Sequence, residues 1–314
     1  KITLDEQLYN NLPDQLLEND IKILILGGSV AEDFSYNDTS QEFEKNDFTI
    51  HPQNIFQNLL NKKFKTNRFK IYNAAIGGGK QPQQLFKLYY LYLVDEKFDV
   101  VINLDGFNEI ALSFSENIDI GNSFLYPRNY SRIISTFNSD LNCIQKSNQY
   151  TASYNFIPLI ELYKLSVIRN CHIKTEGDPK EKRNQFSKMS NFKQLKSEKY
   201  FEYIEELWIR SSEQIESFSN EKKFQYIHVI QPSHYLKNSK IYSKKELELL
   251  NYPKYGNPIS KHYGKLNFEN LNIKNKLDLR YIFKENNKTL YRDYCCHLNN
   301  YGMKLIADKI IKES

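Results

Sequence analysis

Apolar and polar residues alternate in blocks along this chain, and four short apolar runs predict buried strands. The runs cover residues 21–26, 69–75, 99–104 and 224–230, and they are rich in β-branched and aromatic residues. Gly or Pro follows each run within a few residues, which is typical of a strand end. Such continuous apolar runs are typical of parallel strands that are buried on both faces.

Apolar residues at helical spacing predict helices around these strands. They cover residues 52–64, 83–94, 200–218 and 301–312, and a further amphipathic stretch spans 4–19. That stretch has acidic residues but no Lys or Arg, so we expect a packed N-terminal helix rather than a membrane-surface one. Strands and helices that alternate with short loops predict a doubly wound, mostly parallel α/β sheet with right-handed crossovers.

Two polar stretches interrupt this pattern, near residues 112–200 and 236–275. The first has turn residues and a Lys-rich part, and the second is rich in Tyr, Lys and Asn with several Pro and Gly. Long stretches with weak structure inside a compact domain are usually insertions or lids. Because no segment resembles an interdomain linker, we predict a single domain over 1–314 with these two insertions.

Composition and charge narrow the class of protein. The 314 residues are 40% hydrophobic and 26% charged, which excludes a mainly disordered chain. The net charge is +5, with a local basic excess between 174 and 199, and this is too small to predict a nucleic acid partner. No apolar run is long enough to span a bilayer. The chain begins with Lys1, so we expect either a cytoplasmic protein or one exported with a signal or anchor missing from this chain.

The four cysteines are too few for a disulfide scaffold. Cys295 and Cys296 are adjacent, whereas Cys143 and Cys171 stand alone, so no metal-ligand spacing is present in the sequence. The glycine motifs of dinucleotide-binding and phosphate-binding loops are also missing. The sequence therefore predicts neither a metal nor a cofactor.

The first predicted strand ends in Gly27, Gly28 and Ser29, at the sheet edge where ligands bind in this fold class. The glycines allow a sharp turn, and Ser29 would open the next helix with its hydroxyl exposed. Its N–H would point outward with the helix dipole behind it, which suits a nucleophile whose N–H stabilises an oxyanion. A helix N-cap or a glycine-rich loop explains the same residues, so this block alone decides nothing.

Three further blocks place polar groups at corresponding positions. The second strand ends in glycines 77–79, which can aim a backbone N–H into a cleft. Asn108 follows the third strand, and its amide can donate to an oxyanion, although Asn after Gly is also common in turns. Asp293 precedes His297 and is close enough in sequence to fix the tautomer of the imidazole.

Together the four blocks resemble the SGNH hydrolases, the GDSL-type esterase and lipase superfamily, whose Ser, Gly, Asn and His occur in this chain order. The resemblance covers about residues 21–110 and 278–310, and the matching residues are Ser29, Gly78, Asn108 and His297. There are three departures. Gly-Gly-Ser replaces the commoner Gly-Asp-Ser, Glu109 replaces the final Asp of the third block, and Asp293 lies four rather than three residues before His297.

The resemblance implies a three-layer α/β/α fold of flavodoxin type and ester hydrolysis through an acyl-enzyme. Ser29 would be the nucleophile, His297 its general base, and Asp293 the group that orients His297. The N–H groups of Ser29 and Gly78 and the side chain of Asn108 would form the oxyanion hole. The expected substrate is a small-molecule or carbohydrate ester.

Two other functions stay open at this point. An O-acyltransferase would use the same residues to pass the acyl group to a sugar hydroxyl, and a binding protein would keep the scaffold without catalysis. The complete set of four blocks argues against a binding protein without catalysis. His234 follows the fourth strand and is a candidate for substrate binding. His228 lies inside that strand and is predicted to be a core residue.

Overall fold

A parallel sheet forms the centre of the computed structural model, which describes residues 20–35, 55–118 and 197–313. The five strands are β1 (Ile21–Gly27), β2 (Phe69–Asn73), β3 (Val100–Asp105), β4 (Gln225–Ile230) and β5 (Lys276–Asp278). They are paired in the order β2-β1-β3-β4-β5, and every pairing is parallel. The predicted helix 4–19 lies outside the described residues, as does most of the predicted insertion 112–200.

The strand order identifies the fold class. From β1 the chain adds β2 on one side, and it then crosses back to add β3, β4 and β5 on the other side. This is the order of flavodoxin-like, doubly wound sheets, in which ligands bind beyond the carboxyl ends of the strands where the winding reverses. In this protein that place lies between β1 and β3. The predicted doubly wound parallel sheet is therefore confirmed.

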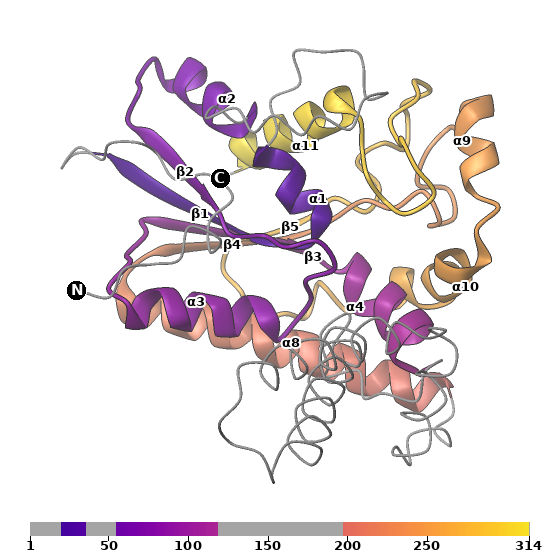
Figure 1. Cartoon of the computed structure of the whole chain (residues 1–314), viewed down its shortest axis with the longest axis horizontal. Helices are drawn as coiled ribbons and strands as arrows, with labels where there is room; N and C mark the ends of the chain where they lie inside the picture. Colours follow the sequence, from indigo (N-terminus) through magenta and orange to yellow (C-terminus); the bar gives the residue numbers. More distant parts are fainter. Residues whose placement is uncertain (1–19, 36–54, 119–196, 314) are drawn as a thin grey trace, which may run out of the picture. The chain divides into compact units, whose positions relative to one another are not determined.

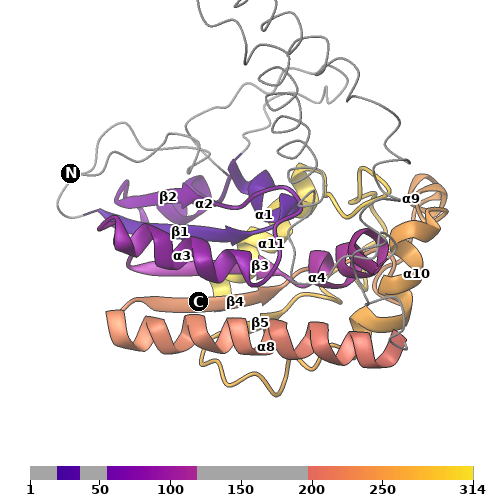
Figure 2. The same cartoon turned by 60° about the horizontal axis from the view of Figure 1, so that its bottom comes forward.

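Helices cover both faces of the sheet, so the described unit has three layers (Figure 1). One face carries α3 (Gln83–Leu93) and α8 (Ser197–Lys222), and the other carries α1 (Ser29–Glu32), α2 (Ile55–Phe64) and α11 (Asn300–Glu313). Figure 2 shows α8 running along the β4 and β5 side of the sheet. The central strands β1, β3 and β4 are almost entirely buried, as their apolar runs predict.

The segment 236–275 was expected to have weak structure, and this expectation is wrong. It contains α9 (Lys244–Leu249) and α10 (Pro253–His262), and the short edge strand β5 follows directly. Reciprocal hydrogen bonds between Ser243 and Glu246 cap the start of α9, and a proline occupies the first turn of α10. Capping residues mark the start of α9, which buries only Glu246, whereas α10 buries Tyr255, Ile259 and His262 at helical spacing.

The prediction of a single domain stays a prediction, because most of the first insertion lies outside the described residues. The third block leads into α4 (Phe107–Leu112), which continues into a π-helical turn, Ser113–Ile118. Of the helices that the structure describes, none combines the length and the apolar character needed to cross a membrane.

Candidate active site

The loops that follow β1, β2 and β3 meet at the carboxyl edge of the sheet. Ile76 N–H donates to the carbonyl of Gly27 at 3.2 Å, which joins the second loop to the first. A methyl group at Gly79 would lie 2.8 Å from the same carbonyl oxygen. The backbones therefore approach so closely that glycine is required where they touch. Parallel pairing of the three strands produces this meeting, because it brings their carboxyl ends to one edge.

Ser29 is the first residue of α1 and is partly exposed. The turn before it needs Gly27, whose φ of +143° disfavours a side chain and whose Cβ would lie 2.1 Å from the carbonyl oxygen of Leu104. As predicted, Ser29 opens a helix. However, α1 has only four residues and passes into a 3₁₀ turn, so the helix dipole contributes less than we expected.

The backbone N–H groups of Ser29 and Gly78 lack hydrogen-bond acceptors among the described residues. Gly78 has a φ of +78°, a conformation that favours glycine, and this turn sets the direction of its N–H. In the part of the chain that the structure describes, neither the N–H of Ser29 nor that of Gly78 donates a hydrogen bond. Both remain available to an acceptor at this edge of the sheet.

Asn108 completes this group of donors. Its Nδ2 donates to the carbonyl of Gly79 at 2.8 Å, and a methyl group at Gly28 would lie 2.1 Å from the same nitrogen. The side chain is 7% exposed, so the third loop holds it firmly against the first two. A primary amide has two hydrogens, and the bond to Gly79 orients the amide while leaving the second hydrogen for another acceptor.

Glu109 ties the second and third loops together. One carboxylate oxygen accepts the N–H of Gln81 and the other accepts the N–H of Gly106, both at 2.8 Å. Burial and the nearby charge of Asp105 raise the pKa of Glu109 to about 8. The longer Glu in place of the usual Asp therefore bridges two loops that both lie at the candidate site.

Asp105, the last residue of β3, forms several hydrogen bonds with buried side chains at this edge of the sheet. Its carboxylate accepts hydrogen bonds from Trp208 Nε1 at 2.9 Å and from Asn103 Nδ2 at 2.6 Å. His228 Nε2 lies 2.9 Å from the same carboxylate, and the His228 side chain is fully buried in the sheet. This agrees with the prediction that His228 is a core residue.

The fourth block forms a tight loop in which Asp293 contacts His297. Asp293 Oδ2 is hydrogen-bonded to His297 Nδ1. Its other oxygen accepts the backbone N–H groups of Cys295, Cys296 and His297 at 2.9, 3.2 and 3.3 Å. Arg292 N–H closes the loop by donating to the carbonyl of His297 at 3.0 Å. The turn absorbs the extra residue between Asp293 and His297, so the four-residue spacing still allows contact.

The charges in this loop adjust both partners. Burial lowers the pKa of His297, but the hydrogen bond and charge of Asp293, with the charges of Asp33 and Cys295, raise it above its ordinary value. Burial raises the pKa of Asp293, and the hydrogen bonds from His297 and the backbone bring it below its ordinary value. The pair is thus built to stabilise an imidazolium next to a carboxylate.

An ion pair links the His297 loop to the helix that begins with Ser29. Arg292 Nη2 lies 2.9 Å from both carboxylate oxygens of Asp33, which follows α1 directly. Asp33 is 8% exposed, and burial raises its pKa although the charges of Arg292 and His297 oppose this. No hydrogen bond between Ser29 and His297 occurs among the described residues. The Arg292–Asp33 pair therefore connects the two elements without a direct contact between Ser29 and His297.

His234 lies deeper than the sequence suggested. Its side chain is 1% exposed, neither ring nitrogen has a hydrogen-bond partner, and burial lowers its pKa to about 4. The ring packs between those of Tyr235 and Tyr291, with centroids 4.1 and 4.6 Å away. A direct contact with substrate stays a prediction, because the two nitrogens are covered in this structure.

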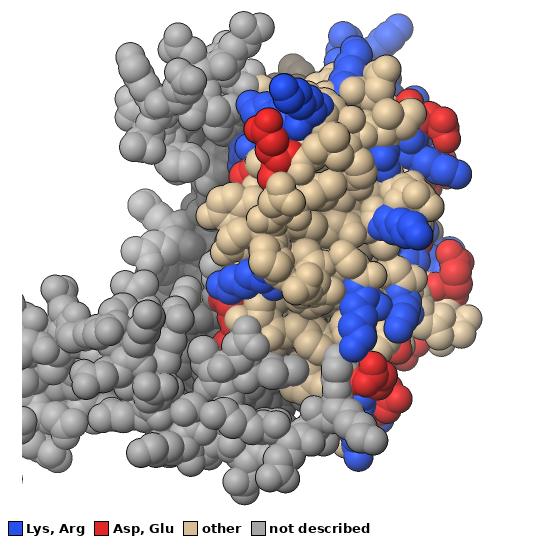
Figure 3. Space-filling model, turned by 90° about the vertical axis from the view of Figure 1, so that its right-hand side faces the viewer, with Lys and Arg blue, Asp and Glu red and all other residues tan. Residues whose placement is uncertain are grey.

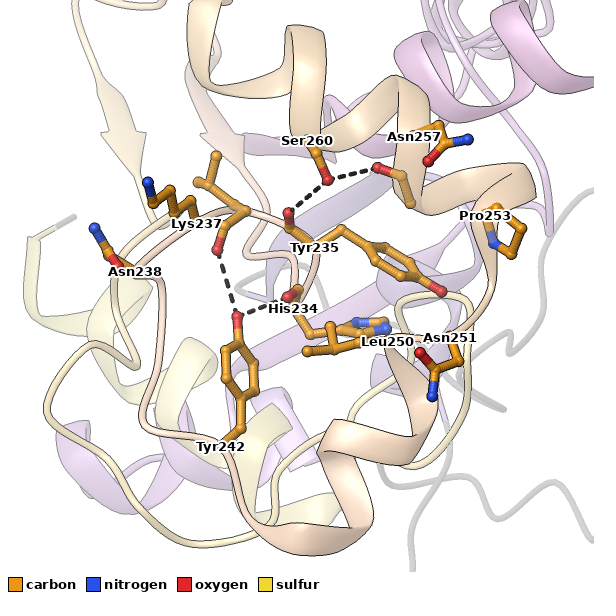
Figure 4. Close-up of a pocket in the computed structure, with 12 residues that line it drawn as sticks. His234, Tyr235, Lys237, Asn238, Tyr242, Leu250, Asn251, Pro253, Asn257 and Ser260 are labelled. Carbon is orange, nitrogen blue, oxygen red and sulfur yellow. Dashed lines mark hydrogen bonds between the residues drawn. The ribbon is translucent and has the colours of Figure 1, made fainter.

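A pocket of about 600 Å³ opens beside His234 (Figure 4). It is formed by the segment after β4 and by the chain around α9 and α10, the region whose structure the sequence did not reveal. Tyr235 forms one wall, and its hydroxyl is hydrogen-bonded to the carbonyl of Tyr294 in the His297 loop. The pocket is also lined by Lys237, Tyr242, Asn251, Asn257 and Ser260.

Of the described residues, one group has ligand atoms close enough to share a metal ion. Cys295, Cys296 and His297 each offer one such atom, and these atoms lie within 4.8 Å of one another. The spacing of these residues in the sequence does not predict a metal site, because three consecutive residues converge only when the chain turns tightly.

Fold and site together define an α/β protein with a partly exposed serine, backbone N–H groups without acceptors and a carboxylate–histidine pair at the carboxyl edge of its sheet. No protein-family model and no curated protein matches the chain. Several solved structures resemble it. The acetyl xylan esterase AlAXEase is 15% identical over 93% of this chain and 98% of that chain, with a TM-score of 0.41.

Two further solved structures are similar to the same extent. A putative GDSL-like lipase from Parabacteroides merdae ATCC 43184 is 15% identical over 96% of this chain and 98% of that chain, with a TM-score of 0.38. The acetylxylan esterase Axe2 from Geobacillus stearothermophilus is 13% identical over 95% of this chain and 96% of that chain, with a TM-score of 0.37. A shared fold does not fix an activity, so function has to be inferred from the residues of the site.

Proposed function

We propose that this protein is a serine esterase that hydrolyses acyl esters through an acyl-enzyme on Ser29. The observation that supports this most is the convergence of four separate chain segments at one edge of the sheet. They supply a hydroxyl on a sharp turn, two open backbone N–H groups, an oriented amide and a carboxylate–imidazole pair. These are the parts that acyl transfer requires.

In the first half-reaction, Ser29 Oγ attacks the ester carbonyl while His297 takes the hydroxyl proton. Asp293 holds Nδ1–H of the imidazole, which directs the other ring nitrogen to the reaction and stabilises the imidazolium. The N–H groups of Ser29 and Gly78 and the second amide hydrogen of Asn108 stabilise the oxyanion. His297 then protonates the leaving alcohol, and the acyl group stays on Ser29.

In the second half-reaction, water gives a proton to His297 and attacks the acyl-enzyme. The same three donors stabilise the second tetrahedral intermediate, and collapse releases the acid and restores Ser29. The mechanism depends on His297 being neutral at the start of each half-reaction. Because the pKa of His297 is raised, activity should fall at acidic pH.

The leaving alcohol is, in this proposal, the sugar of a carbohydrate ester. Hydroxyl and amide side chains from Tyr242, Asn251, Asn257 and Ser260 line the pocket beside the His297 loop, and Lys237 is its one charged lining residue in the described chain. Figure 3 looks onto this end of the molecule, where charged side chains surround a broad uncharged area. Uncharged polar groups with aromatic walls suit a neutral polyhydroxylated ring.

The test is covalent labelling with a fluorophosphonate, combined with hydrolysis of a short-chain chromogenic ester. The wild-type protein should be labelled at Ser29 and should hydrolyse the ester. Ser29→Ala should lose labelling and at least about 10⁴-fold in kcat. Ser217→Ala, on α8, is the matched control and should behave like the wild type. Undiminished turnover in Ser29→Ala, after removal of contaminating esterases, would exclude this nucleophile.

The sugar part of the proposal has its own test. Asn257→Ala should raise KM for an acetylated sugar and leave KM for the chromogenic ester unchanged, because only the sugar would reach the pocket. If the substitution changes KM equally for both substrates, or for neither, the pocket does not bind the alcohol part of the substrate.

A further inference from the structure

We infer that Cys295, Cys296 and His297 form a binding site for a thiophilic divalent metal ion such as Zn²⁺, and that an ion bound there stops ester hydrolysis. Metal binding stands on the arrangement of these three side chains alone. The effect on hydrolysis rests on the proposed function, because it follows from the role of His297 as general base.

The loop that carries these residues explains how three neighbours in sequence converge. Consecutive side chains on an extended chain point to opposite sides. Here Asp293 Oδ1 accepts the N–H groups of all three residues, at 2.9 to 3.3 Å, and so curls the chain around its carboxylate. The potential ligand atoms of Cys295, Cys296 and His297 consequently lie within 4.8 Å of one another.

The two sulfur atoms are already close to chelating distance. Cys295 Sγ lies 3.0 Å from Cys296 Sγ, and neither cysteine forms a disulfide. Zinc–sulfur bonds of about 2.3 Å in a tetrahedral site place two sulfurs about 3.8 Å apart, so the thiols need to separate by less than about 1 Å. Cys296 is 2% exposed, whereas Cys295 is partly exposed, so an ion can enter from the side of Cys295.

The donor set selects the kind of ion. Two thiolates and one imidazole favour Zn²⁺ or Cd²⁺ over Mg²⁺ and Ca²⁺, which prefer oxygen ligands. Asp293, hydrogen-bonded to Nδ1 of His297, is the kind of carboxylate partner that metal-binding histidines commonly have. The Asp293 carboxylate contacts all three ligand residues, and its negative charge would favour a cation there, whereas Asp33 is paired with Arg292.

An ion held by His297 would prevent that residue from accepting the proton of Ser29. Three protein ligands leave one coordination position open, which water would fill. The esterase would then respond to thiophilic metal ions, and the response would depend on two cysteines that the hydrolytic mechanism does not use. This dependence separates the site from unspecific binding of zinc to a catalytic histidine.

The experiment titrates the reduced, full-length protein with Cd²⁺ and follows thiolate-to-metal charge-transfer absorption. We expect one Cd²⁺ per chain. Cys295→Ser should weaken binding by at least the roughly 10–100-fold that loss of even an outer-shell partner costs. A Cys143→Ser/Cys171→Ser double variant is the matched control and should bind as the wild type does. Ser29→Ala should also bind normally although it is inactive.

Ester hydrolysis supplies the second measurement. Zn²⁺ should inhibit the wild type and the Cys143→Ser/Cys171→Ser control at the same concentration. Cys295→Ser, measured relative to its own metal-free activity, should need at least tenfold more Zn²⁺. Unchanged Cd²⁺ binding in both Cys295→Ser and Cys296→Ser, or unchanged inhibition in both, would overturn the inference. If no variant or wild type hydrolyses esters but Cd²⁺ binding depends on Cys295, the metal site is supported and the proposed function fails.

Discussion

The two sides of the candidate site are held together in different ways. On the oxyanion side, Gly78 lies in the loop after β2 and Asn108 lies at the start of α4, just after β3, and these two strands flank β1. Short backbone contacts and the buried Glu109 hold the two segments together. On the base side, His297 lies in a loop that precedes α11 and does not follow a strand directly. Its position depends on side-chain contacts, from Asp293 within the loop and from Arg292 to Asp33.

This difference predicts different sensitivities. A group that the sheet positions keeps its place when one side chain is removed, so a substitution there removes only that group's own contribution. A group held by charged side chains changes both its position and its pKa when one of them is lost. We therefore expect substitutions on the base side to alter pH profiles, and substitutions on the oxyanion side to alter kcat alone.

The largest effect should follow from Asp293→Asn. The amide can favour the wrong imidazole tautomer, and a loss of about 10⁴-fold in kcat is expected. Because the Asp293 charge raises the pKa of His297, the acidic limb of the remaining activity should move to lower pH. The check is kcat/KM against pH, with the exposed Asp95→Asn as control. A variant that keeps most of its activity would show that His297 works as a dyad with Ser29.

Asn108→Ala should reduce kcat by about 10²–10³ with little change in KM, because the amide acts mainly on the developing negative charge. The pH profile should keep its shape, since no charge is removed. Steady-state kinetics at several pH values test this. An increase in KM alone would identify Asn108 as a residue that binds the ground state of the substrate.

Arg292→Gln should lower kcat/KM by about tenfold, because the His297 loop loses its tie to the helix of Ser29. Asp33→Asn should have a similar cost, and it should also move the acidic limb to lower pH because Asp33 raises the pKa of His297. The double variant should cost less than the sum of the two, with a coupling of about 0.5–3 kcal/mol. Arg210→Gln, in an exposed ion pair on α8, is the control. Additive effects would show that the pair does not position the loop.

The last effect concerns Glu109 and the stability of the fold rather than the rate of hydrolysis. Its pKa is raised to about 8, so between pH 6.5 and 8 the folded protein keeps a proton that the unfolded chain has released. Its contribution to the free energy of unfolding therefore falls as pH rises, by at most about 1.4 kcal/mol per pH unit. Urea unfolding of wild type and Glu109→Gln should show the difference shrinking over this window. A constant difference would mean that Glu109 is ionised throughout.

Several features followed from local sequence patterns. The apolar runs of β1, β2, β3 and β4 are long and continuous, and burial on both faces produces that pattern without reference to the rest of the chain. The turn at Gly27 and the serine after it were identified because a sharp turn at a strand end needs glycine. The residues on the oxyanion side could be predicted for the same reason, since they lie within a few residues of the strand ends.

Other features could not be found in this way. α9 and α10 are short and lie in a stretch rich in polar residues, Gly and Pro, so a search for apolar runs misses them. The pocket beside them forms only when the chain between His234 and Ser260 folds back on itself. The bridging role of Glu109 was also hidden, because its two partners, Gln81 and Gly106, belong to different loops. Sequence patterns record a residue's own element and say little about which loop lies opposite.

The His297 loop shows most clearly which features the sequence predicts and which depend on the tertiary structure. The sequence by itself determined that an acid and a histidine occur near the chain's end, four residues apart, and it left open whether they touch. The tertiary structure decided that, because a turn around Asp293 brings its carboxylate to the imidazole and gathers two thiols beside it. Arg292 and Asp33 are 259 residues apart in the sequence, and only tertiary packing brings them together. Contacts across such distances depend on how layers stack, and no local pattern of residues encodes that stacking.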